Sequence, residues 1–119
     1  MNVELLREFC LGLKGVEEGF PFGAETMVFK VMGKMFCLCG LEHTPLQFNV
    51  KCDPEKAIEL RETYSGVIPG YHMNKQHWNT IVMDGSFTDD LAKQWILDSY
   101  ELVAASLSSK LKMELNNLP

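Results

Sequence analysis

The stretch TMVFKVMGKMFCLC, residues 26–39, decides the fold of this chain. It holds two runs rich in β-branched and aromatic residues with Gly33 between them, a pattern that predicts a β-hairpin. The next apolar run, LQFNVK at residues 46–51, alternates between apolar and polar positions, which predicts a third strand. Because no helical segment separates these strands, we expect them to form an antiparallel sheet.

Capping signals predict helices on both sides of these strands. Each signal is a side chain that can accept a hydrogen bond from the first turn of a helix. Asn2 precedes a predicted helix from residue 3 to about residue 13, and Asp53, followed by Pro54, precedes one that runs to about residue 64. Thr88 precedes a long C-terminal helix. The buried stripe of this helix is expected to include Leu91, Trp95 and Leu102, with Ile96 and Tyr100 as additional members.

The remaining segments carry weaker signals. Residues 15–23, GVEEGFPFG, are expected to form a loop because glycines and a proline interrupt any periodicity. Residues 65–74 are expected to form a loop or an irregular strand, and residues 77–84 another strand that ends in a turn at Asp84-Gly85. Residues 106–119 either continue the C-terminal helix or add a short one.

The order of elements is therefore helix, three strands, helix, one or two strands, helix. This order predicts an α+β fold in a single domain of residues 1–119, with a largely antiparallel sheet and helices packed on one face. The amphipathic helices at the two ends need an apolar partner, and one face of the sheet supplies it. The other face is expected to stay open.

The composition is that of an ordinary globular protein. Hydrophobic residues make up 46% and charged residues 23% of the 119 positions. The sequence shows no apolar run long enough to span a bilayer and no signal peptide, so we expect a cytoplasmic protein without a membrane partner. The net charge of −5 disfavours nonspecific binding to nucleic acids, although residues 30–75 hold six bases against five acids.

The four cysteines are expected to be free thiols, because their spacing fits no zinc framework. A metal or redox site is a weaker alternative, in which Cys37 and Cys39 share one strand face with His72 or His77 nearby. We predict no cofactor and no metal. We also predict no enzymatic activity, because no spacing assembles a nucleophile, a base and an orienting group.

Strand alternation predicts which side chains occupy the open face. Gln47, Asn49 and Lys51 should point outward, opposite to Phe48 and Val50. In the hairpin, Met27, Phe29 and Val31 form the better core row, and a turn of two or four residues places Phe36 and Leu38 inside. Cys37, Cys39 and Trp78 would then face outward. An exposed Trp78 beside lysines and amides suits a recognition surface, whereas the alternative is that it closes the rim of the core.

The segment from residue 69 to 103 resembles the YjbR/MmcQ family of small bacterial proteins. The resemblance rests on Pro69, Asn74-Lys75, His77-Trp78, Asp84-Gly85-Ser86 and Ser99-Tyr100, and upstream on GKMF and FNVKCDPEKAIEL. It implies a fold like that of the frataxin homologue CyaY, with an antiparallel sheet and helices on one face. It also implies DNA binding, since family members are commonly labelled so.

Two functions follow as hypotheses. The first is a nucleic-acid-binding module in which lysines meet phosphates and Trp78 stacks on a base. The second is a protein-interaction or regulatory module that docks a partner on the open face or through the acidic helix with Glu4 and Glu8, for which the acidic charge is no obstacle. In either case the candidate binding residues are Lys30, Lys34, Lys51, His72, Asn74, Lys75, His77 and Trp78.

Overall fold

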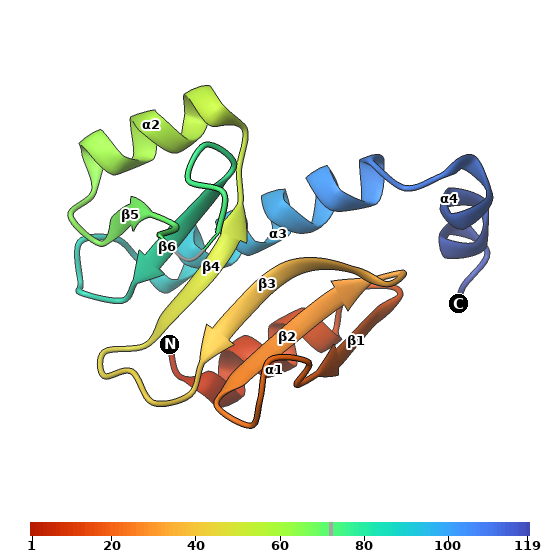
Figure 1. Ribbon diagram of the computed structural model, residues 1–119, viewed down its shortest axis with the longest axis horizontal. Coiled ribbons are helices and arrows are strands. Elements are labelled where there is room, and N and C mark those ends of the chain that lie inside the picture. The colour runs from red at the N-terminus through yellow and green to blue at the C-terminus, as the bar shows by residue number, and fades with distance from the viewer. Residues whose placement is uncertain (72) are drawn as a thin grey trace.

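The computed structural model describes residues 1–71 and 73–119 as an α+β domain (Figure 1). The elements in chain order are α1 (Val3–Leu11), β1 (Val16–Gly19), β2 (Thr26–Val31), β3 (Lys34–Gly40), β4 (Gln47–Lys51), α2 (Pro54–Thr63), β5 (Val67–Pro69), β6 (Trp78–Val82), α3 (Asp89–Ala105) and α4 (Ser109–Asn116). The six strands form one antiparallel sheet in the order β1-β2-β3-β4-β6-β5. Among the described residues no helix combines the length and the apolar character needed to cross a bilayer.

The three predicted capping residues each begin a helix. The Asn2 side chain accepts from Leu5 N at 2.9 Å. The Asp53 carboxylate accepts from Lys56 N at 3.3 Å, and Thr88 Oγ1 accepts from Leu91 N at 3.1 Å. Residues 106–119 contain a separate short helix, α4, rather than a continuation of α3.

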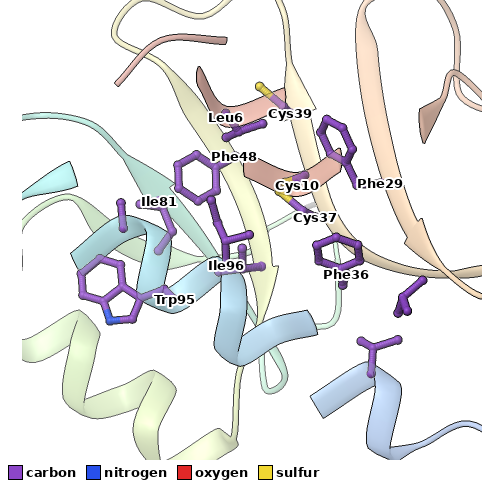
Figure 2. Close-up of a cluster of buried hydrophobic side chains, with 14 of the residues drawn as sticks. Leu6, Cys10, Phe29, Phe36, Cys37, Cys39, Phe48, Ile81, Trp95 and Ile96 are labelled. Atoms are coloured by element: carbon purple, nitrogen blue, oxygen red, sulfur yellow. The ribbon is translucent and has the colours of Figure 1, made fainter. Parts of the chain in front are cut away.

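Helices α1 and α3 lie behind the sheet in Figure 1, and the face toward the viewer carries no helix in the described part of the chain. The main core fills the space between this helical layer and the sheet, and it contains Phe29, Phe36, Phe48, Ile81 and Ile96 (Figure 2). Helix α2 packs on the same side, because the inward-facing Asn79 bonds to its Ala57 carbonyl. The predicted arrangement, helices on one face and an open second face, is confirmed.

The stripe that α3 buries differs in part from the prediction. Trp95 and Ile96 are buried, but Leu102 is 41% exposed and Val103 takes its place in the core. The buried positions Ala92, Ile96, Ser99 and Val103 alternate in steps of four and three, which is the spacing of one helical face. The prediction for Leu102 was wrong because the helix presents a face rotated by one residue.

The segment predicted to be a loop at residues 15–23 contains the edge strand β1. Val16 pairs with Val31, and Gly19 pairs with Val28, so β2 holds this segment in the sheet. Pairing with a neighbouring strand outweighs a local sequence that disfavours strands.

A β-bulge in the hairpin overturns the predicted orientation of the two cysteines. The turn has two residues, Met32 and Gly33, both at positive φ as a type I′ turn requires. The register shifts because Phe29 pairs with Cys37 while Lys30 pairs with Met35, which leaves Phe36 as an extra residue. Beyond this bulge every side chain changes face.

Cys37 and Cys39 therefore point into the core, where Cys37 lies beside Cys10 of α1 (Figure 2). Leu38, predicted to be inside, lies on the open face. No group of three or more His, Cys, Asp or Glu side chains in the described residues is placed to hold a metal ion. The outward pair of thiols on which the alternative of a metal or redox site depended is thus absent.

Candidate functional site

The open face of the sheet contains a groove with a cavity volume of about 430 Å³. Its floor is a row of residues across four strands, in which Leu38 pairs with Asn49, Asn49 with Thr80, and Thr80 with Ile68. A second, shorter row is formed by Thr26, Gly40 and Gln47. The walls come from three loops that contribute Phe22, His43, Tyr71 and Met73. The size is within the range of small-molecule sites in proteins.

Gly40 makes room for one wall of the groove. A Cβ built on Gly40 would lie 2.6 Å from His43 Cδ2 and 2.9 Å from His43 Nε2, so the imidazole lies directly against the strand. Any larger residue at this position would push the ring away. The position of His43 therefore depends on the absence of a side chain at residue 40.

The rim of the groove carries two exposed aromatic rings. Phe22, in the loop between β1 and β2, is 63% exposed, and Tyr71, in the loop between β5 and β6, is 61% exposed. Lys75 Nζ lies 5.1 Å from the centre of the Tyr71 ring, within the range of a cation–π contact. Large exposed rings beside a cavity are typical of binding surfaces.

Trp78 is on the open face, as predicted, but it is only 8% exposed. It packs with Val28 and Leu38 in a small second cluster, against which Met35 and Met73 are half-buried. The predicted exposure of Trp78 was wrong because Met73, from the loop between β5 and β6, packs against the cluster that holds the indole.

Arg61 of α2 fixes the end of this loop next to β6. Its Nε donates to the Oδ1 of the fully buried Asn79 at 2.7 Å. Its Nη2 donates to the Lys75 carbonyl and, at 3.4 Å, to the Trp78 carbonyl. Gly70 N donates to the same Trp78 carbonyl at 2.9 Å. The loop that carries Tyr71 is thus held at both of its ends.

The structure does not gather the four predicted lysines into one patch. Lys34 is on the helical side, where its Nζ donates to the Ser106 carbonyl at 3.4 Å. Lys30 is paired across the strands with the acidic Glu17. Lys51 is half-buried next to Trp78, and only Lys75 lies at the rim of the groove.

The other predicted site residues have local structural contacts. The Asn74 carbonyl accepts from the backbone N–H groups of His77 and Trp78, and its side chain accepts from Gln76 N at 2.9 Å. The His77 carbonyl accepts from Cys52 N at 2.7 Å. His72 lies outside the described residues.

Comparison with known proteins supports the family resemblance. The family model described as YjbR matches residues 11–102. The chain belongs to the YjbR family. It is 37% identical over 108 residues to the uncharacterized protein YbdF of Escherichia coli O157:H7, covering 90% of this chain and 88% of that protein. It is 29% identical over 101 residues to the uncharacterized protein YjbR of E. coli K12, covering 85% and 86% of the two chains.

Solved structures agree with this fold. A crystal structure of the Deinococcus radiodurans protein DR2400, of the domain family DUF419, superposes with a TM-score of 0.91 at 37% identity and covers 99% of this chain and 89% of that one. A protein from Pseudomonas syringae superposes with a TM-score of 0.72 at 24% identity, covering 86% and 98% of the two chains, and shows the fold alone.

The residues that carry the YjbR resemblance mostly support the scaffold. The Asp84 carboxylate accepts from the hydroxyls of Ser65 at 2.8 Å and Ser86 at 2.7 Å, which closes the turn after β6. These bonds, led by those from Ser86, hold the pKa of Asp84 below its ordinary value of 3.8. Ser99 Oγ donates to the Phe36 carbonyl at the bulge and accepts from Lys51 N. The Asp-Gly-Ser segment is therefore a turn, as the sequence predicted.

The groove depends on residues that the sequence did not single out. Alternation correctly placed Gln47 and Asn49 on the open face, but no pattern distinguished Phe22, His43 or Tyr71 from ordinary loop residues. A glycine three residues before a histidine, as in Gly40 and His43, is too common to signal a contact. Only the three-dimensional arrangement brings these loops together.

Proposed function

We propose that the protein is a binding module without catalytic activity, which takes an uncharged ligand of small-molecule size into the open-face groove. The observation that carries this proposal is the groove itself, about 430 Å³ on the helix-free face, with Phe22 and Tyr71 more than half exposed at its rim. A concave site lined by apolar and aromatic side chains, with a few polar groups, is the usual form of a ligand site.

The chemistry of the lining supports binding rather than catalysis. Among the described lining residues only His43 and Tyr71 have an ionisable side chain, and no carboxylate or thiol lies with them. The nearest strand cysteines face the core, and burial raises the pKa of Cys39 to about 11. A thiol with so high a pKa remains protonated near neutral pH and is a poor nucleophile.

A titration with benzyl alcohol, followed by ¹H–¹⁵N NMR of the whole chain, tests the proposal. We expect the largest shifts at groove residues such as Leu38, Asn49 and Thr80. Replacing Phe22 by alanine should weaken binding. Replacing Phe20, which is 47% exposed but lines a different hollow, should not. Saturating shifts elsewhere on the molecule, or none at all, would contradict the proposal.

DNA binding is the second candidate, and one specific observation favours it. The exposed ring of Tyr71 lies beside the ammonium group of Lys75, so a base could stack on the ring while its phosphate meets the lysine. The scattered positions of Lys30, Lys34 and Lys51 favour a weak contact with a single strand over a clamp on a duplex.

Binding of a labelled oligodeoxythymidylate at low salt tests this second candidate. Lys75→Glu should weaken binding, whereas Lys34→Glu changes the net charge equally on the helical side and should matter much less. Equal losses in the two variants, or no binding of the oligonucleotide, would remove the candidate. A general charge effect would act on both lysines alike.

A further inference from the structure

Two side-chain amides on β4 point into the groove with hydrogen-bonding capacity to spare. Thr80 Oγ1 donates to Asn49 Oδ1 at 2.5 Å, which orients the amide so that its Nδ2 turns away from Thr80. Among the described residues, Asn49 Nδ2 has no hydrogen-bond partner. Every buried side-chain nitrogen or oxygen atom in these residues does have a partner, so Nδ2 is not one of the buried atoms. The Asn49 Nδ2 group is therefore reachable from the groove that Asn49 lines.

Gln47 lies two residues before Asn49 on the same face of the strand. Residues at this separation are about 7 Å apart, which is close enough for both to contact one small ligand. The Gln47 amide also makes no side-chain hydrogen bond within residues 1–71 and 73–119, so it offers both a donor and an acceptor. Together the two amides offer a ligand an N–H donor from Asn49 and either an N–H donor or a carbonyl acceptor from Gln47.

The aromatic rings at the rim add a preference for flat ligands. Phe22 and Tyr71 are 63% and 61% exposed, which leaves ring surface on which a ligand can stack. Stacking of a planar group on an aromatic face contributes more than its buried area alone. His43, held against Gly40, supplies a third ring in the wall.

The groove disfavours charged ligands. Its described lining contains no Asp, Glu, Lys or Arg, and the whole chain carries a net charge of −5. An ionised group that loses its water among these lining residues finds no opposite charge there, because Lys75 lies at the rim and outside the lining. The preferred ligand is therefore neutral.

From these features we infer that the groove binds a planar, uncharged heterocycle whose edge carries an N–H beside a carbonyl group. Gln47 and Asn49 form hydrogen bonds to that edge. This inference rests on the proposed use of the groove and adds the chemical class of its ligand. A lactam edge offers the donor and acceptor that two amides can match. Such a ring could reach the groove free or as an unpaired base in a single strand.

Three probes of similar size test the class, with binding followed by NMR on the full chain. Uracil has the neutral lactam edge, orotate has the same ring with a carboxylate, and benzyl alcohol has an aromatic ring without an amide. We expect uracil to bind more tightly than either of the others and to shift the side-chain amide signals of Gln47 and Asn49. Gln47→Met should weaken uracil binding about fivefold, the loss expected for a neutral hydrogen bond, and should weaken the binding of benzyl alcohol, which has no amide, much less.

The control is Gln76→Met, which makes the same change outside the groove lining and should leave uracil binding intact. If benzyl alcohol binds in the groove but uracil binds no better, the inferred class is overturned while the proposed function stands. If neither probe binds, both are overturned. A decamer of deoxyuridine distinguishes the sources: tighter, salt-dependent binding supports a base within a strand, and salt-independent binding equal to that of deoxyuridine supports a free heterocycle.

Discussion

Replacing Arg61 by methionine should destabilise the protein and loosen one wall of the groove. Methionine keeps much of the apolar stem but removes the donor to Asn79, whose side chain is fully buried. A buried acceptor without a partner costs about 1–3 kcal/mol, whereas the exposed Lys75 carbonyl can bind water instead and the Trp78 carbonyl keeps its bond from Gly70 N. We therefore expect a loss of about 2 kcal/mol in the free energy of unfolding, which for a chain of this length lowers the Tm by about 8 °C.

The double variant Arg61→Met/Asn79→Leu separates the two effects of Arg61. Replacing both partners by apolar side chains removes the unsatisfied acceptor, so most of the lost stability should return. The carbonyls of Lys75 and Trp78 still lack their guanidinium donor in the double variant, so weakened benzyl alcohol binding should persist. Urea unfolding monitored by tryptophan fluorescence measures the first quantity and NMR titration the second. A double variant as unstable as the sum of the two single variants would refute this account of Arg61.

Three further predictions concern residues of the scaffold. Ser99→Ala removes the bridge between the Phe36 carbonyl and Lys51 N, so we expect a loss of about 2–4 kcal/mol in urea unfolding; a change below about 0.5 kcal/mol would rule out the bridge. Iodoacetamide near neutral pH should label at most Cys52 in the native protein and all four cysteines in urea, as counted by mass spectrometry, since the other three are buried. The pKa of Asp84 is lowered in the folded protein, so its contribution to stability is fully present above pH 3.8 and is lost as the pH falls through the lower pKa of the folded state. Asp84→Asn should therefore make the free energy of unfolding depend less on pH across that acidic range, and an unchanged slope would contradict this.

The features of the fold that depend on local chemistry were predictable from the sequence. A capping side chain needs only the backbone N–H groups of the next turn, so Asn2, Asp53 and Thr88 each marked a helix start. Strand alternation needs only a regular pleat, so Gln47 and Asn49 were correctly placed outward. The helices and the antiparallel sheet follow from signals of this kind.

The features that depend on pairing between strands were not predictable in the same way. One extra residue at the bulge reverses the faces of Cys37, Leu38 and Cys39, and no local propensity marks Phe36 as that residue. Likewise β1 is a strand because β2 pairs with it, although its own sequence suggests a loop. Trp78 is covered by a loop whose path depends on Arg61 from another helix.

The separation between scaffold and groove explains why the family resemblance reveals the fold but not the ligand. The polar groups of the matching residues Asp84, Ser86 and Ser99 form hydrogen bonds within the protein, so these residues determine how the strands are joined. The groove walls come instead from Phe22, Tyr71 and a third loop, whose side chains make few such bonds. Loops on a rigid scaffold can change without loss of the fold. Among relatives that share this sheet, ligand preference should therefore follow the residues of these three loops and of the open face of β4, and the recognisable motif should carry little information about it.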